Sequence, residues 1–157
     1  MNLENKTIVI TGGGQGLGRT MAIDFAKSGA NIALIDLNEE LLQETVKLVE
    51  GQGANAKYYI ANVSNEEQVE STFKQINDDF KGIDGLINNA GILRDGMFVK
   101  AKDGVVSKKM SLAQFQSVID VNLTGVFLCG REAAVHMIEN GSKGVIVNMS
   151  SIARGGN

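Results

Sequence analysis

A glycine-rich stretch near the N-terminus has the composition of a phosphate-binding turn. Thr11–Gly18 reads Thr-Gly-Gly-Gly-Gln-Gly-Leu-Gly and follows Thr7–Ile10, an apolar run with the composition of a strand. Leu17, Met21 and Phe25 then recur at helical spacing. A strand, a glycine turn and a helix in this order present free N–H groups at the helix N-terminus, where the helix dipole also favours negative charge. We therefore expect a phosphate group to bind at this turn.

The spacing of the glycines indicates which phosphate compound fits. The common dinucleotide fingerprint G-x-G-x-x-G fits in no register, because Leu17, Arg19 or Met21 always occupies the place of the third glycine. The pattern Thr-Gly-x-x-x-Gly-x-Gly does fit, beginning at Thr11 and ending at Gly18.

Two other interpretations of the same stretch remain open. Gly13–Thr20 reads G-x-x-x-x-G-R-T, which is a Walker A loop with Arg19 in place of its lysine. This replacement counts against a nucleotide hydrolase, because a forked guanidinium is not a neutral exchange for a compact ammonium group on phosphate. A glycine-rich turn that binds no ligand is the third interpretation, since isolated glycine motifs are weak signals.

An acidic residue follows the glycine turn at an informative distance. Asp36 ends the apolar run Ile32–Ile35, about 20 residues beyond the turn, where a carboxylate can accept hydrogen bonds from the ribose hydroxyls of NAD. Asp36 could instead supply charge or a cap to the helix that begins around Asn38–Glu40. The ribose interpretation favours NAD over NADP, because Gln15 offers no positive charge for a 2′-phosphate.

The composition is that of one globular domain. The chain has 157 residues, 43% of them hydrophobic and 21% charged, and a net charge of −3 that gives no general attraction to nucleic acid or anionic membranes. No apolar run approaches membrane-spanning length, and the first six residues do not resemble a signal peptide. We therefore expect a cytoplasmic protein with no nucleic-acid or membrane partner.

Cysteine and histidine are too scarce for several kinds of site. Cys129 is the one cysteine, so an internal disulfide framework and a cysteine-built zinc site are excluded, and its apolar helical surroundings predict a buried thiol. The one histidine, His136, lies beside charged residues and is expected at the surface. A Ser-His-Asp hydrolase would also need the elbow G-x-S-x-G, which is absent. We expect no metal site.

Strand and helix patterns alternate along the chain. After the glycine turn a helix is predicted to about Ser28, with Gly29 as its stop. Strands are predicted at Ile32–Ile35, Lys57–Ala61, Gly85–Ile87 and Val145–Val147, with helices between them, one opened by a capping box at Ser64–Glu67 and another opened at Ser111. This alternation predicts a parallel α/β sheet with right-handed crossovers.

One segment, residues 94–110, breaks this alternation. It carries five basic residues and two acidic ones, a local charge of +3, so the rest of the chain sums to −6. Asp103-Gly104 lies between two apolar-containing runs and predicts a hairpin with a two-residue turn. The segment is either a basic flap that recruits an acidic or phosphate-bearing substrate or a solvated surface hairpin.

With these residues in view, the sequence resembles the short-chain dehydrogenase/reductase family over its whole length. Thr11–Gly18 matches the family's cofactor loop, and Asn88–Gly91 matches its N-N-A-G motif. Asn122 matches the helix asparagine of the family's catalytic tetrad. Val147–Ser151 matches the strand that delivers the catalytic serine, which by alignment is Ser151.

The resemblance implies a fold, a cofactor and a set of site residues. The fold would be one Rossmann-like domain over residues 1–157, a doubly wound parallel sheet of five strands in the order 3-2-1-4-5, without the family's later strands and helices. The cofactor would be NAD(H). Asn62 and Val63 stand where the family's adenine contact usually reads Asp-Val. The expected cofactor-binding residues are Gly12, Gly14, Gln15, Gly16, Leu17, Gly18, Asp36, Leu37, Asn62, Val63, Asn89, Ala90 and Gly91.

The resemblance also implies a reaction. Hydride would pass between the cofactor and a small alcohol or carbonyl substrate, with Ser151 hydrogen-bonded to the substrate oxygen and Asn122 ordering a proton-relay water. Gly91–Asp95 looks like the 3-oxoacyl-carrier-protein reductase branch, so a thioester linked to acyl carrier protein or coenzyme A is a candidate substrate. Family members usually form dimers or tetramers through the helix here predicted at Leu112–Glu139.

The family's general acid is missing. It is a tyrosine in a Y-x-x-x-K motif beyond the serine, and the only tyrosines here are Tyr58 and Tyr59, neither followed by such a lysine. Hydride transfer to a carbonyl needs a proton donor, so we expect the chain alone to be inactive. Three hypotheses follow: a dehydrogenase whose remainder lies outside this sequence, a non-catalytic dinucleotide-binding or interaction module, and, remotely, a nucleotide hydrolase.

Overall fold

Five parallel strands form the central sheet of the computed structural model, which describes residues 2–151. The strands are β1 (Thr7–Thr11), β2 (Asn31–Asp36), β3 (Ala56–Ile60), β4 (Gly85–Asn88) and β7 (Val145–Asn148), and their order is β3-β2-β1-β4-β7. Every pairing in this sheet is parallel. The predicted order 3-2-1-4-5 is confirmed, since β7 is the fifth strand of this sheet. The predicted third strand was placed one residue too late.

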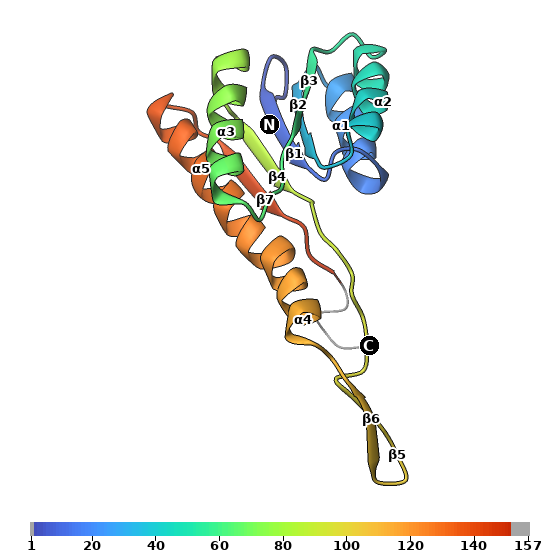
Figure 1. The fold of residues 1–157 in the computed structure, drawn as a ribbon. Helices are drawn as coiled ribbons and strands as arrows, with labels where there is room; N and C mark the ends of the chain where they lie inside the picture. The colour runs from blue at the N-terminus through green and yellow to red at the C-terminus, as the bar shows by residue number, and fades with distance from the viewer. Residues whose placement is uncertain (1, 152–157) are drawn as a thin grey trace.

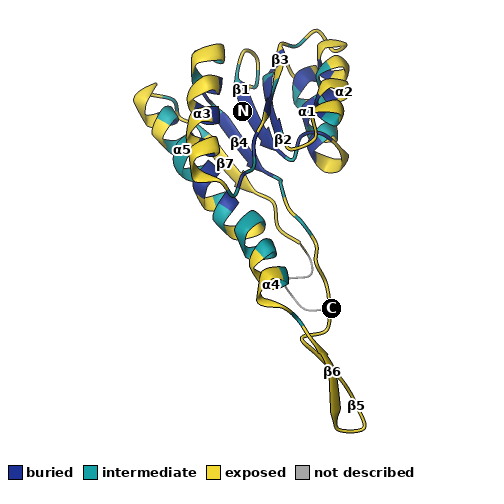
Figure 2. Ribbon diagram, in the orientation of Figure 1, coloured by how far each residue is buried: buried dark blue, intermediate teal, exposed yellow. Residues whose placement is uncertain are grey.

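Helices cover both faces of the sheet (Figure 1). One layer holds α1 (Gly16–Lys27) and α2 (Glu39–Glu50), and the other holds α3 (Glu66–Phe80) and α5 (Gly125–Glu139), which lie side by side. Each layer has its own apolar core: Leu34 and Leu42 are fully buried on the first face, Phe73 and Leu86 on the second. The strands β1, β2 and β4 are buried on both sides (Figure 2), which explains their continuous apolar runs.

Asparagine and serine side chains begin three of the helices. Asn38, Asn65 and Ser111 each accept a hydrogen bond from the backbone N–H three residues later, which satisfies a donor at the helix end. The capping box predicted at Ser64–Glu67 is wrong by one position, because Asn65 is the N-cap of α3. Ser64 instead donates its hydroxyl to Asn62 Oδ1 in the preceding turn.

The second layer contains one long helical segment, Leu112–Glu139. It comprises α4 (Leu112–Ile119), a π-helical turn η1 (Asp120–Thr124) and α5. Among the described residues it is the one helix long and apolar enough to cross a membrane by length and composition, with a mean hydropathy of 1.2 over 18 residues. The expectation that no segment approaches this length is wrong by that measure. Only 17% of those 18 residues are buried, because the helix packs against α3 and the sheet on one side alone.

A two-stranded hairpin projects from the body of the domain (Figure 1), as predicted for residues 94–110. Its strands β5 (Val99–Lys102) and β6 (Val105–Lys109) are antiparallel and exposed throughout. Asp103 and Gly104 have φ angles of 49° and 80°, and positive φ at both central residues is the backbone of a type I′ turn.

The strand β7 is exposed at every residue (Figure 2). It pairs with β4 alone, and within residues 2–151 its outer edge has no partner strand. Its apolar side chains Val145, Ile146 and Val147 are 46%, 38% and 40% exposed.

The carboxylate of Asp84 connects the amino-terminal ends of β1 and β4. Asp84 accepts hydrogen bonds from the Lys6 ammonium (2.9 Å), the Thr7 N–H (3.0 Å) and the Ser142 hydroxyl (3.2 Å). Burial alone would raise the pKa of Asp84, but these three donors and the Lys6 charge outweigh it, and the pKa lies below its usual value. Folding is therefore favoured by the ionised carboxylate.

We predict that Asp84→Asn lowers the free energy of unfolding by about 1 kcal/mol at pH 7. Because the folded state depresses the pKa of Asp84, this contribution is present above about pH 4 and is lost as the pH falls through the folded-state pKa. Urea unfolding of both proteins at pH 7 and pH 3 measures the effect. Asp24→Asn is the control, since Asp24 makes only an exposed pair with Lys27. An equal difference at both pH values would contradict the prediction.

Candidate functional site

The glycine turn brings two backbone segments closer together than side chains would allow. Gly12 and Gly16 have φ angles of 65° and 56°, which residues with a Cβ rarely adopt. A Cβ on Gly18 would overlap the carbonyl oxygen of Gly12, and one on Gly13 would lie 2.7 Å from Leu34 Cδ2. Gln15 precedes α1 without capping it through its side chain. The first N–H groups of α1 therefore remain available to an anion.

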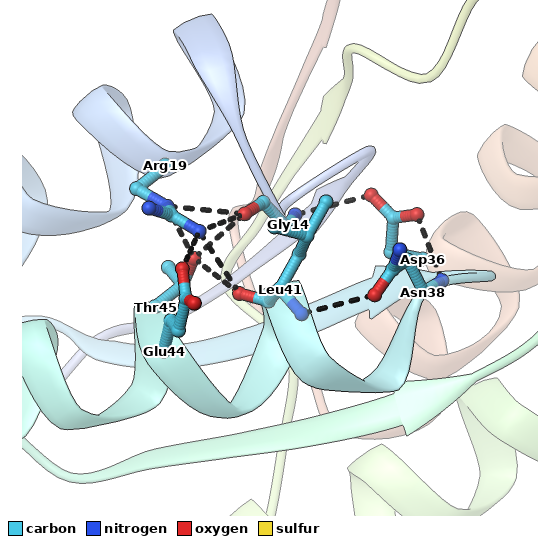
Figure 3. A network of polar contacts seen from close by, with 7 residues as sticks. All are labelled: Gly14, Arg19, Asp36, Asn38, Leu41, Glu44 and Thr45. Atoms are coloured by element: carbon cyan, nitrogen blue, oxygen red, sulfur yellow. Dashed lines mark hydrogen bonds and ion pairs between the residues drawn. The ribbon is translucent and has the colours of Figure 1, made fainter.

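Asp36 holds this turn from the end of β2. Its Oδ2 accepts a hydrogen bond from the Gly14 N–H (3.1 Å), and its Oδ1 accepts from the N–H groups of Leu37 (2.7 Å) and Asn38 (3.3 Å). The helix that follows is capped by Asn38, so Asp36 is not its N-cap. The carboxylate instead joins the glycine turn to the β2–α2 connection (Figure 3).

Arg19 holds the carbonyl side of the same residue, Gly14. Its guanidinium donates to the Gly14 carbonyl oxygen from both Nε (3.0 Å) and Nη2 (2.6 Å), and reaches Thr45 and Glu44 on α2 at 2.9 Å each (Figure 3). A Walker A lysine would have to reach a bound phosphate. Arg19 is committed to the turn and to α2, so the structure gives the Walker A interpretation no support.

The N-N-A-G segment closes over the turn from β4. Thr11 Oγ1 accepts from the N–H groups of Asn89 and Ala90, both at 3.0 Å, and Asn89 Nδ2 donates to the carbonyl oxygens of Thr11 and Gly12, both at 3.1 Å. Asn88 points the other way, donating to Asn148 Oδ1 (2.9 Å) on β7. These asparagines therefore fasten three neighbouring strands at their carboxyl ends.

Asn122 lies in the π-helical turn and reaches the same segment. Its Oδ1 accepts from the Ile92 N–H (2.8 Å), and its Nδ2 donates to the Ile92 carbonyl oxygen (2.9 Å). π-helical turns inside α-helices are frequent at functional sites. Ser151 follows β7 at this same end of the sheet and is exposed.

An open cavity of about 310 Å³ lies where these segments meet. Nine of the thirteen predicted cofactor residues line it: Gly12, Gln15, Asp36, Leu37, Asn62, Val63, Asn89, Ala90 and Gly91. The other four predicted residues belong to the glycine turn and do not line the cavity: Gly14, Gly16, Leu17 and Gly18. Four lining residues were not predicted, namely Ile35, Ala61, Ile92 and Val121, although each neighbours a predicted position along the chain.

Comparisons with known proteins identify the family of the chain. A family model described as short chain dehydrogenase matches residues 6–156. The chain belongs to the short-chain dehydrogenase family. It is 38% identical to a 2,5-dichloro-2,5-cyclohexadiene-1,4-diol dehydrogenase of Sphingobium indicum, covering 97% of this chain and 56% of the relative. It is 34% identical to the 3-oxoacyl-[acyl-carrier-protein] reductase FabG of Thermotoga maritima, covering 97% and 58%.

A solved short-chain dehydrogenase structure shares the fold. The crystal structure of an NAD+-bound xylitol dehydrogenase superposes with a TM-score of 0.86 at 32% identity, covering all of this chain and 57% of that one. The chain thus spans somewhat more than half the length of the curated relatives it matches. Identity to FabG is no higher than identity to the diol dehydrogenase, so the comparisons do not single out the reductase branch.

Neither tyrosine of this short-chain dehydrogenase sequence lines the cavity. The Tyr59 hydroxyl donates to Asp79 Oδ2 (2.7 Å), and burial together with this carboxylate raises the pKa of Tyr59. A general acid needs a pKa near the working pH, so this shift has the wrong sign.

Cys129 is buried as predicted, and burial with the nearby Glu132 raises the pKa of its thiol to about 12.

His136 was predicted at the surface, and this is wrong. Its side chain is only 12% exposed, and its Nδ1 lies 3.4 Å from Glu139 Oε2. Glu139 is 64% exposed whereas the His136 ring is mostly covered, a difference that the spacing did not indicate. Within residues 2–151, no group of three or more His, Cys, Asp or Glu side chains could hold a metal ion.

We predict that Gly18→Ala lowers the free energy of unfolding by about 1–3 kcal/mol, because the added methyl group would overlap the backbone at Gly12. Gly130→Ala is the matched control: its Cβ would approach no atom closer than 4.0 Å, and alanine favours the helix α5. Urea unfolding measures both variants. Equal stability of Gly18→Ala and the parent chain would show that the turn can relax.

Proposed function

We propose that this chain binds NAD(H) in the 310 Å³ cavity at the carboxyl ends of β1, β2 and β4. The observation that carries the proposal is the glycine turn itself: its close backbone approaches and the uncapped first turn of α1 leave N–H groups facing outward, as a pyrophosphate requires. Open α/β sheets bind ligands at this edge, next to the point where the strand order reverses.

Asp36 is the proposed ligand of the adenosine ribose. Its Oδ2 accepts one hydrogen bond from the turn, which leaves that oxygen able to accept another from a ribose hydroxyl. The same negative charge would repel a 2′-phosphate, so NAD(H) is favoured over its phosphorylated form. Asn62 and Val63 line the cavity beyond Asp36, where the adenine would lie. Within the described residues Asn62 Nδ2 donates no hydrogen bond, which leaves a donor for the base.

The proposed reaction of the whole protein is reversible hydride transfer between NAD(H) and an alcohol or carbonyl compound. The cofactor supplies or accepts the hydride. We assign to Ser151 the hydrogen bond to the substrate oxygen, and to Asn122, held by Ile92, the ordering of a proton-relay water. A thioester carried by acyl carrier protein or coenzyme A remains a candidate substrate, alongside smaller diols and ketones.

We further propose a homo-oligomer in the cytoplasm. Leu112, Leu123, Phe127 and Ile138 are each more than 60% exposed on the Leu112–Glu139 helix. Large apolar side chains gathered along one helix are typical of interfaces between subunits, and a second copy is the partner proposed for this helix.

Replacing Asp36 tests the cofactor assignment. Asp36→Asn keeps an oxygen that can accept from Gly14 but removes the charge, so the affinity for NADH should fall about tenfold while the affinity for NADPH rises. Fluorescence titration with both cofactors measures this. Asp24→Asn, on an exposed position of α1, should change neither affinity. If Asp36→Asn keeps the parent's preference between the two cofactors, Asp36 does not bind the ribose.

Turnover distinguishes the enzyme from a binding module. Because no tyrosine lines the cavity, the 157-residue chain should bind NADH yet oxidise or reduce no alcohol or carbonyl compound. Absorbance at the NADH band measures turnover with a panel of diols, ketones and acyl thioesters. Measurable turnover would show that another group donates the proton, and absence of NADH binding would reject the proposed function altogether.

A further inference from the structure

The projecting hairpin places two lysines directly opposite each other. Lys100 on β5 pairs with Lys108 on β6, and like charges at such a position destabilise a pair of strands. With Lys102, Lys109 and Asp103 the two strands and their turn carry four positive charges and one negative charge. Within residues 2–151 none of these lysines forms an ion pair. Within the described part of the chain no ion pair offsets the repulsion between Lys100 and Lys108.

Both lysines line a second cavity, of about 290 Å³, at the base of the hairpin. Its other walls are Asp95, Gly96, Met97, Met110 and Gln114. The lining residues carry two positive charges and one negative charge, a sum of +1, and the two methionines add a polarisable apolar surface. This cavity is separate from the proposed cofactor cavity and shares no residue with it.

Several contacts fix the shape of this second cavity. The type I′ turn sets the register of the strands, and the Ser107 hydroxyl donates to the Lys100 carbonyl oxygen (3.1 Å) beside the irregularity after Lys100. Gln114 on α4 donates to the Arg94 carbonyl oxygen (2.9 Å), which ties the base of the hairpin to the helix. A Cβ on Gly96 would lie 3.1 Å from Gln114 Nε2, so a glycine permits this approach.

The hairpin lies at the end of the sheet where ligands of open α/β sheets bind. It follows the carboxyl end of β4, the same end of the sheet as the glycine turn, and stands away from the domain (Figure 1). Ligands of open α/β sheets approach from this end. A charged cavity here is therefore open to a ligand whose other end extends toward the sheet.

We propose that the Lys100–Lys108 cavity binds the phosphate group of an organic phosphate monoester. A phosphate dianion would neutralise both ammonium groups at once and turn their mutual repulsion into attraction to a shared ligand. Met97 and Met110 would contact the apolar part of the same molecule. A monocarboxylate carries only half the negative charge of the phosphate, so its attraction to the two ammonium groups is smaller, and it should bind more weakly beside Asp95.

Titration of the ¹⁵N-labelled 157-residue chain with phenyl phosphate, without cofactor, tests the proposal by NMR. Saturable shifts are expected at Lys100, Lys108 and Met110, and they should be weaker for benzoate and absent for benzyl alcohol. Lys100→Gln and Lys108→Gln should each weaken phenyl phosphate binding at least tenfold. Lys102→Gln is the matched control: Lys102 lies on the same exposed strand but does not line the cavity, so its loss should change affinity less than twofold.

NMR contacts across the strands show whether a variant has lost the binding site alone or the whole hairpin. Removing one of two opposed charges relieves repulsion, so contacts between Ala101 and Val106, which face each other across the strands, should persist in the NMR spectra of both variants. If Lys102→Gln weakens phenyl phosphate binding as much as the other two variants do, the binding reflects general charge attraction and the proposal is overturned. Benzoate binding as tightly as phenyl phosphate, or shifts that do not saturate, would also overturn it. None of these outcomes depends on NADH binding.

Discussion

The contact between the Gly12 carbonyl and Gly18 sets the geometry on which the site depends. Because Gly18 has no side chain, α1 can begin directly after the turn, with its N-terminus at the carboxyl end of β1. The Gly12 carbonyl oxygen also accepts a hydrogen bond from Asn89, so the same atom positions the segment after β4. A bulkier residue at Gly18 would displace both the helix and the asparagine.

Much of the fold could be predicted because three of its strands, β1, β2 and β4, are buried on both faces. Such strands appear as continuous apolar runs, and all five strands of the sheet were predicted to within one residue at each end. The buried faces of the helices were harder to predict. In α1 the residues Leu17, Met21 and Phe25 marked the helical period, but Leu17 is 66% exposed and the buried residues are Gly18, Ala22 and Ala26. Small residues let α1 approach the sheet closely, and an apolar periodicity does not indicate which neighbouring stripe does so.

The site was predicted less completely, for a different reason. The glycine turn, Asp36 and the N-N-A-G segment have local signatures, whereas the contacts of Arg19 on α1 with Glu44 and Thr45 on α2 span 25 and 26 positions. Likewise, the π-helical turn at Asn122 depends on a hydrogen-bond register that residue types do not specify. The cap at Asn65 and the inward turn of His136 are also decided by tertiary packing, which overrides the local preference.

The hydrogen bonds that hold Gly14 on both sides have a consequence for motion. Asp36 holds its N–H, Arg19 holds its carbonyl oxygen, and Arg19 also reaches the Leu41 carbonyl oxygen and Thr45 in α2. Opening of the turn therefore breaks the contacts that hold the first half of α2, and fraying of α2 frees the turn. Their amide hydrogens should exchange with solvent in one cooperative unit. Since such coupling is reciprocal, any ligand that orders the turn will also slow exchange in a helix that it never touches.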